Sequence, residues 1–112
     1  ALDYILAQTT DLIDKLLVYP DKMLADLNLT GGLIYSPRVL LALVAKGAYR
    51  DTAYRWVQRN AMKRWLQGED FYKNLCKDED VRKYLNEEEI KACFDYKPML
   101  VHVDEIFARF GL

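Results

Sequence analysis

The sequence predicts an all-α fold, and three observations support this prediction. Apolar residues recur at spacings of three and four in several segments, which places them on one face of a helix. Gly47, Gly68 and Gly111 each follow such a segment, at the position where glycine commonly ends a helix. No stretch shows the sustained apolar–polar alternation of a half-buried strand. We therefore expect one compact multi-helix domain that spans residues 1–112 without a repeat or a dividing linker.

The N-terminal segment predicts a long amphipathic helix. Its apolar stripe consists of Leu2, Ile5, Leu6, Thr9, Leu12, Ile13, Leu16 and Leu17. The pattern is already running at residue 2 with no capping side chain before it, which indicates that Ala1 is a cut end. Pro20 ends this helix and opens a short one. The turn Thr30-Gly31-Gly32 follows, since adjacent glycines tolerate backbone angles that other residues avoid.

Two longer helices are predicted in the middle of the chain. Ser36 and Pro37 are expected as N-cap and first helical residue of a helix that contains Val39–Lys46 and stops at Gly47. This helix is apolar on nearly every side, so it must be surrounded by other elements. A second helix is predicted over Arg50–Gln67, ending at Gly68. Its expected inner stripe consists of Tyr54, Val57, Ala61, Met62, Trp65 and Leu66.

The C-terminal third predicts several short helices. Two are expected around residues 71–76 and 81–85, and Asn86 with Glu89 three residues later is a capping-box pattern that starts another. Pro98 is expected to open the last helix. Its inward-facing residues would be Leu100, Val103, Ile106, Phe107 and Phe110.

Composition excludes several classes of protein. The chain is 52% hydrophobic and 29% charged with a formal net charge of −1, an ordinary globular balance with no field to attract nucleic acid. The longest apolar run, Val39–Ala45, is far shorter than the roughly 20 residues of a bilayer span. The single histidine predicts that the chain has no metal site. Cys76 and Cys93 lie outside any CxxC motif and are predicted to be free thiols in a reducing compartment.

Few residues combine into a recognisable catalytic pattern. His102 and Asp104 are two positions apart and point to different sides of a helix, so His102 is interpreted as a surface residue. The Gly31-Gly32 turn with Ser36 and Arg38 offers backbone N–H groups, a hydroxyl and a guanidinium, which suit a phosphate or carboxylate. Ser36 and Arg38 are therefore the candidate substrate-binding residues, and no catalytic residue is assigned.

A row of basic residues on the Arg50–Gln67 helix allows a second hypothesis. Arg55, Arg59 and Lys63 line its outer side and could contact nucleic acid. The acidic stretches 78–80 and 87–89 oppose this interpretation, and a solvated face paired with neighbouring acids is the commoner meaning of such a row. A free-standing helical interaction module is a third alternative.

The sequence resembles the C-terminal domain of adenylosuccinate lyases over essentially its whole length. The matching blocks are Leu16–Pro20 with Met23, Asn28–Leu41, Ala53-Tyr54, Val57–Met62, and His102–Asp104 with Ile106, Phe107 and Arg109. This resemblance implies the all-α fold of the fumarase/aspartase superfamily, whose cytoplasmic homotetramers share a bundle of long helices. It also implies an enzyme of purine biosynthesis that needs no cofactor. Fumarate is released by β-elimination from adenylosuccinate, giving AMP, and from succinyl-aminoimidazole carboxamide ribotide.

The resemblance places the chemistry outside this chain. The family's catalytic serine loop, catalytic histidines and phosphate-binding segment lie upstream, so the fragment is expected to be inactive alone. Its partners would be the remainder of its own chain and the other subunits, with a nucleotide substrate in the whole enzyme and neither nucleic acid nor membrane. Ser36, Arg38, Tyr54 and Gln58 match the family and are assigned to domain structure and the periphery of the active site. Tyr49 stands where relatives often have a capping Ser, so this helix start is expected to fray or to borrow an acceptor.

Overall fold

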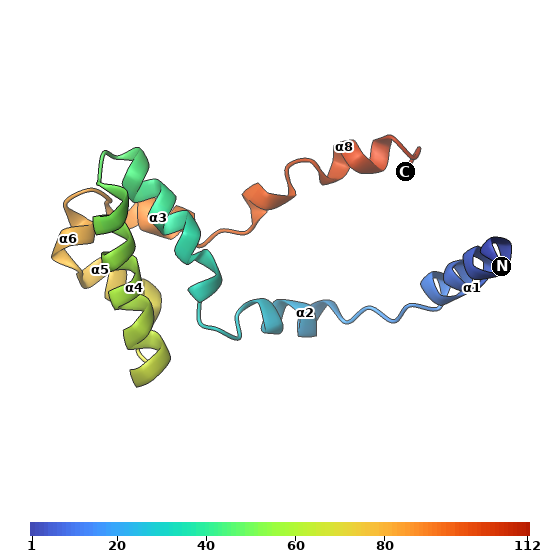
Figure 1. The fold of residues 1–112 in the computed structure, drawn as a ribbon, viewed down its shortest axis with the longest axis horizontal. Helices are drawn as coiled ribbons and strands as arrows, with labels where there is room; N and C mark the ends of the chain where they lie inside the picture. The colour runs from blue at the N-terminus through green and yellow to red at the C-terminus, as the bar shows by residue number, and fades with distance from the viewer.

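Ten helical segments follow one another along the chain in the computed structural model, which describes residues 1–112 (Figure 1). They are α1 (Leu2–Asp14), α2 (Pro20–Leu27), the 3-10 helix η1 (Leu33–Tyr35), α3 (Ser36–Ala45), α4 (Arg50–Gln67), α5 (Phe71–Lys77), α6 (Glu79–Arg82), α7 (Glu87–Cys93), the 3-10 helix η2 (Lys97–Leu100) and α8 (Val103–Ala108). No strand occurs, so the predicted all-α fold is confirmed.

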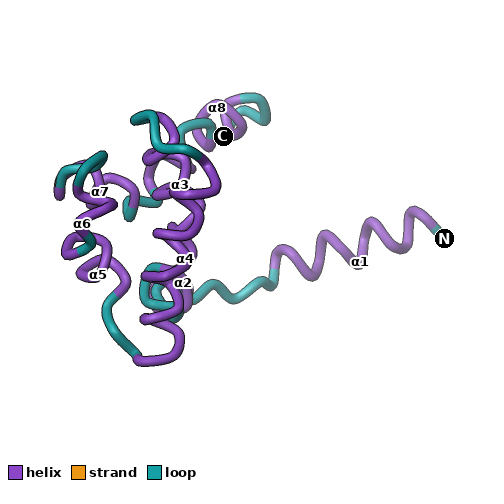
Figure 2. The backbone as a smooth tube through the Cα atoms, turned by 60° about the vertical axis from the view of Figure 1, so that its left-hand side comes forward, coloured by secondary structure: helices purple, strands orange, loops and turns teal.

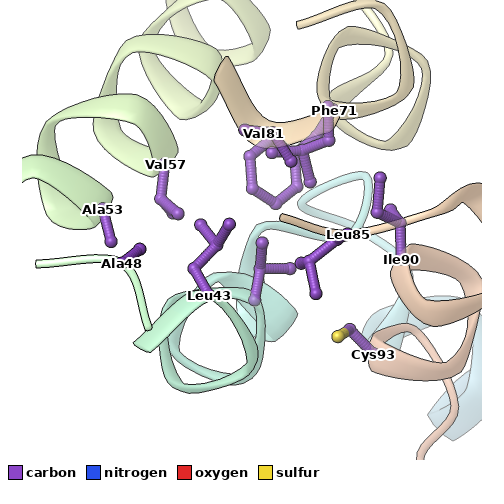
Figure 3. Packing of buried hydrophobic residues seen from close by; sticks show 11 residues of the cluster. Leu43, Ala48, Ala53, Val57, Phe71, Val81, Leu85, Ile90 and Cys93 are labelled. Atoms are coloured by element: carbon purple, nitrogen blue, oxygen red, sulfur yellow. The ribbon is translucent and has the colours of Figure 1, made fainter. Parts of the chain in front are cut away.

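Residues 30–95 form a helical body that contains the core. Within it, α3 packs against α4 and α7, while α5 packs against α4, α6 and α7. Figure 3 shows side chains from these helices converging on one cluster. The cluster consists of Val39, Leu43, Ala48, Ala53, Val57, Phe71, Leu75, Val81, Leu85, Ile90 and Cys93. The helical body is a compact multi-helix unit, and it is shorter than the domain of residues 1–112 that the sequence predicts.

Two arms project from the helical body. The N-terminal arm (residues 1–29) carries α1 and α2, and the C-terminal arm (residues 96–112) carries η2 and α8. Both leave the body toward the same side in Figure 1, and Figure 2 shows α1 standing clear of every other helix. The molecule therefore measures 58 × 31 × 26 Å. None of α1, α2, η2 and α8 has a buried residue.

The arms correct two expectations. The first helix ends at Asp14 rather than continuing through Leu17, and the expected last helix is divided into η2 and α8. Their apolar residues do not face inward, since Leu12 is 66% exposed and Phe110 77% exposed. The physical reason is that periodicity identifies a face that would gain from burial, but nothing within residues 1–112 covers these faces.

Helix α3 begins one residue earlier than predicted. It follows η1 directly, so Tyr35 is the N-cap, and Ser36 is the first helical residue with no capping hydrogen bond from its side chain. Pro37 takes the second position, where a missing N–H is also harmless. Val39 and Leu43 are fully buried, as expected of a surrounded helix, whereas Leu41 is 60% exposed.

Helix α4 has the predicted bounds but a different inner face. It runs from Arg50 to Gln67 and ends at Gly68, whose φ of +72° is the left-handed conformation that glycine adopts readily. The expected inner residues Tyr54, Met62, Trp65 and Leu66 are exposed. Val57 is buried as expected, and the other two buried residues of α4 are Ala53 and Asn60. The inner face of α4 therefore holds the small side chain of Ala53 and the hydrogen-bonded amide of Asn60, where we expected large hydrophobic side chains.

The starts of α4 and α7 contrast in their capping. Tyr49 precedes α4 with no side-chain cap, and its carbonyl accepts the Ala53 N–H at 2.9 Å as the first helical bond. At α7 the predicted capping box is confirmed. Asn86 Oδ1 accepts the Glu89 N–H at 2.8 Å, and Glu89 Oε2 accepts the Asn86 N–H at 2.9 Å.

Candidate functional site

The predicted pair Ser36 and Arg38 lies at the start of α3. The Arg38 guanidinium donates to the backbone carbonyl of Asp95, 57 positions along the chain, and thereby ties α3 to the segment that follows α7. Ser36 is partly buried and its hydroxyl is in no hydrogen bond with the protein. Arg38 therefore has a structural partner, while Ser36 keeps a free hydroxyl.

The Gly31-Gly32 turn contacts a different arginine from the one predicted. Nε of Arg64 donates to the Thr30 carbonyl at 3.4 Å, and its Nη1 donates to the Gly68 carbonyl at 3.1 Å. A Cβ at Gly31 would lie 2.5 Å from Cζ of Arg64, so the guanidinium rests directly on this glycine. The other side of the turn is closed by a ring, because a Cβ at Gly32 would lie 2.6 Å from Phe94. Sequence spacing offers no signal for Arg64, which comes from 33 positions away.

The basic row on α4 is divided between paired and unpaired cations. Nη2 of Arg59 lies 2.7 Å from Asp78 Oδ2 and 3.1 Å from Asp80 Oδ2. Hydrogen bonds to these two carboxylates raise the pKa of Arg59. Arg55 and Lys63 are in no ion pair. The interpretation that this row pairs with neighbouring acids is confirmed for Arg59, the central member of the proposed nucleic-acid face.

Asp78 is the most heavily hydrogen-bonded side chain in the structure. Its carboxylate accepts from Arg59 Nη2 at 2.7 and 2.8 Å and from Asn60 Nδ2 at 2.6 Å. It also caps α6 by accepting the backbone N–H of Asp80 at 3.0 Å and of Val81 at 3.4 Å. Burial is the largest single influence and would raise the pKa of Asp78, but the hydrogen bonds from Arg59 and Asn60 outweigh it and hold this pKa below its ordinary value. The sequence indicates that Arg59 pairs with nearby acids, but it does not predict that Asn60 joins them or that the cluster connects α4 to α6.

The remaining residues considered from sequence do not assemble into a reactive centre. His102 is a surface residue as expected, with its side chain 78% exposed and its Nδ1 3.3 Å from Glu105 rather than close to Asp104. Cys76 and Cys93 are free, and burial raises the pKa of the Cys93 thiol. No group of three or more histidine, cysteine, aspartate or glutamate side chains is arranged to hold a metal ion. No helix has both the length and the apolar character needed to cross a membrane.

Comparison with known proteins gives a consistent result. A family model described as adenylosuccinate lyase C-terminus matches residues 32–110. Proteins named adenylosuccinate lyase from Helicobacter pylori strains J99 and 26695 are each 46% identical to this chain over 117 aligned residues. The alignment covers 96% of this chain and 27% of each relative, so the chain spans about a quarter of their length. The chain therefore belongs to the adenylosuccinate lyase C-terminal family, as the order of its sequence blocks predicts.

Proposed function

We propose that this chain is the C-terminal helical part of an adenylosuccinate lyase, a carbon–nitrogen lyase of purine biosynthesis. The proposed reaction is a β-elimination that releases fumarate from adenylosuccinate, giving AMP, and from succinyl-aminoimidazole carboxamide ribotide. The observation that carries the proposal is the 46% identity to lyases of that name over 96% of the chain. Since the chain spans about a quarter of those relatives, the activity is proposed for a longer protein that contains it.

Within that enzyme we assign this chain a structural role. A β-elimination needs a base, an acid and stabilisation of the developing negative charge. The best-placed charged groups here already hold helices together, since Arg59 binds Asp78, Arg38 binds the Asp95 carbonyl and Arg64 binds the Thr30 carbonyl. Ser36 and Arg38 would shape the periphery of the active site, and no catalytic residue is assigned to this chain.

The exposed arms support packing against other parts of the enzyme. Apolar residues of α1 such as Leu2 and Leu12 are 71% and 66% exposed, and Phe110 at the other end of the chain is 77% exposed. Exposed apolar surface of this extent marks an interaction site in a soluble protein. The proposed partners are the remainder of the lyase chain and the other subunits of a homotetramer.

A chimeric enzyme tests this proposal. The matching C-terminal region of the Helicobacter pylori lyase is replaced by this chain, and fumarate release from adenylosuccinate is followed in solution. We expect the chimera to be active and a matched truncation without the region to be inactive. Circular dichroism and the oligomeric state show whether each variant has folded, so that loss of activity in a folded, assembled chimera would contradict the proposal.

The isolated chain provides the second arm of the experiment. We expect no fumarate release from these 112 residues, and measurable turnover would overturn the assignment of catalytic groups to other parts of the enzyme. The nucleic-acid alternative through Arg55, Arg59 and Lys63 is not favoured, because Arg59 is already bound to two carboxylates. The free-standing module is not favoured either, since the family match covers residues 32–110.

A further inference from the structure

Each arm joins the helical body next to a backbone carbonyl that an arginine holds. The N-terminal arm ends at residue 29, and the carbonyl of the next residue, Thr30, accepts from Nε of Arg64 at 3.4 Å. The C-terminal arm starts at residue 96, and the carbonyl of the preceding residue, Asp95, accepts from the Arg38 guanidinium. Arg64 belongs to α4 and Arg38 to α3, so each arm is tied at its base to a helix of the body.

The turn at the base of the N-terminal arm is enclosed by side chains on two sides. A Cβ at Gly31 would lie 2.5 Å from Cζ of Arg64, and a Cβ at Gly32 would lie 2.6 Å from Cε1 of Phe94. The ring of Phe94 is itself held in the body, since its centroid lies 5.8 Å from that of the fully buried Phe71. The turn therefore has little room to rotate between the guanidinium and the ring.

The backbone of this turn is also hydrogen-bonded to its neighbours in sequence. The Gly31 N–H donates to the Asn28 carbonyl at 2.9 Å, and the Tyr35 N–H donates to the Gly32 carbonyl at 3.0 Å. Helix α2, which precedes the turn, has no buried residue. The direction of α2 is therefore determined by the turn and by Arg64 rather than by packing of α2 against the body.

The bases of the two arms lie at one place on the body. Phe94, whose ring contacts Gly32, immediately precedes Asp95, whose carbonyl binds Arg38. From this place both arms leave the body toward the same side (Figure 1). The two arginines thus hold neighbouring points from which the two arms start.

We propose that Arg64 and Arg38 are positioning residues for the assembled lyase. Each arginine holds the base of one arm, so that α2 and η2 leave the body in fixed directions and the arms are presented together to neighbouring parts of the enzyme. This inference rests on the proposed function, which takes those parts to be the partners of the arms. A fixed direction favours assembly, because less conformational freedom remains to be lost when the arms bind.

Residual dipolar couplings of backbone amides test the fixed direction of α2 in the 112-residue chain. In the unmodified chain we expect α2 and the helical body to fit one alignment tensor. In Arg64→Gln we expect α2 to need a tensor of its own while the couplings of the body stay unchanged, which shows that the body is still folded. A single tensor in Arg64→Gln, or separate tensors already in the unmodified chain, would overturn the proposal for this arm.

Two further variants make the comparison specific. Arg55→Gln removes the same charge from an exposed position of α4 that is in no ion pair, and α2 should keep the tensor of the body. Arg38→Gln should free η2 from that tensor and leave α2 in it, the reverse of Arg64→Gln. An effect of Arg55→Gln equal to that of Arg64→Gln would show a general effect of charge and contradict the role of the Arg64 contact.

The chimeric lyase described above tests the consequence for assembly. Loss of one hydrogen bond shifts an equilibrium about fivefold, so Arg64→Gln should lower the specific activity about fivefold at low enzyme concentration. The activity should return at high enzyme concentration, because mass action favours the assembled form, and KM should stay unchanged. Arg55→Gln should behave as the unmodified chimera does.

The outcomes separate this inference from the proposed function. An unmodified chimera that folds and assembles but is inactive would contradict the proposed function. An active chimera in which the specific activity of Arg64→Gln does not vary with enzyme concentration would leave the proposed function intact and contradict the positioning role.

Discussion

The helical body and the two arms have similar apolar patterns but opposite degrees of burial. All 13 buried residues lie between Tyr35 and Cys93, within the body. Helix α1 has a regular apolar stripe and buries nothing, whereas α4 has a less regular stripe and buries Ala53, Val57 and Asn60. The difference teaches that periodicity shows which face of a helix would gain from burial, while burial itself depends on what lies opposite that face.

The two regions also differ in the range of their polar contacts. In the arms the ion pairs join residues three or four positions apart, as in Lys15–Asp11 at 2.7 Å and Arg109–Glu105 at 2.7 Å. In the body, Arg59–Asp78 and Lys46–Glu89 join separate helices. Local pairs stabilise one helix by a few tenths of a kcal/mol, whereas pairs between helices determine how the helices are placed.

The largest effect that separates the two regions is expected from removal of a phenylalanine ring. Phe71 is fully buried, so Phe71→Ala should lower the free energy of unfolding by about 3–5 kcal/mol. Phe107 is 50% exposed in the C-terminal arm, and Phe107→Ala should change the free energy of unfolding by less than about 0.5 kcal/mol. Urea unfolding followed by circular dichroism measures both, and similar losses would show that the arm is packed in solution.

Removal of a carboxylate should have the next largest effect. Asp78→Ala breaks the bonds to Arg59 and Asn60 and uncaps α6, with an expected loss of about 3 kcal/mol. The matched variant Asp26→Ala removes only the exposed pair with Lys22 and should cost less than about 0.5 kcal/mol. Urea midpoints of the two variants give the comparison, and a small effect of Asp78→Ala would mean that the cluster does not hold α4 to α6.

Substitution of a glycine at the junction between arm and body should have a smaller effect. Gly31 has a φ of +62° and supports Arg64, while Gly47 has a φ of +94° and a Cβ added there would meet no atom within 4 Å. Both alanine variants carry a backbone cost of about 1–2 kcal/mol. Gly31→Ala should lose more stability than Gly47→Ala, because the added Cβ displaces the Arg64 guanidinium. Equal thermal midpoints for the two variants would contradict the placement of Arg64 on the turn.

The smallest expected effect is a difference in pH dependence. The pKa of Asp78 is lowered in the folded state, so its stabilisation is present above the unfolded value of about 3.9 and is lost as the pH falls through the folded pKa. The urea midpoint of the unmodified chain should therefore fall more steeply between about pH 5 and pH 2 than that of Asp78→Ala. If the urea midpoints of the two chains fall in parallel with pH, Asp78 has the same pKa in the folded and the unfolded state.

Local signals in the sequence predicted much of the secondary structure. The bounds of α4 and the capping box at Asn86 depend on residues that are neighbours along the chain, and both are confirmed. The inner face of α4 was predicted correctly at Val57 and incorrectly elsewhere, because a ranking by hydrophobicity favours Trp65 over Asn60. Asn60 is buried because Asp78, 18 positions away, accepts its hydrogen bond, and periodicity carries no information about such a partner.

The candidate site was less predictable for the same reason. Arg64 contacts the Gly31-Gly32 turn in the fold, whereas Arg38, which is close to the turn in sequence, binds the Asp95 carbonyl. Arg59 and Asn60 of α4 meet Asp78, which caps α6, and their convergence depends on how these helices pack. Spacing along a chain identifies residues that share one helix, and it does not identify residues that two helices bring together.

The polar residues on the inner side of α4 restrict the positions in which this helix can pack. A slide by one helical turn, about 5.4 Å, would remove Asn60 from Asp78 and Arg64 from the Thr30 carbonyl at once. A purely apolar stripe such as that of α1 has no comparable requirement, because one leucine can replace another at each step. We therefore expect α4 to have a single alignment within the body, whereas the alignment of α1 on a neighbouring surface must be specified by that surface.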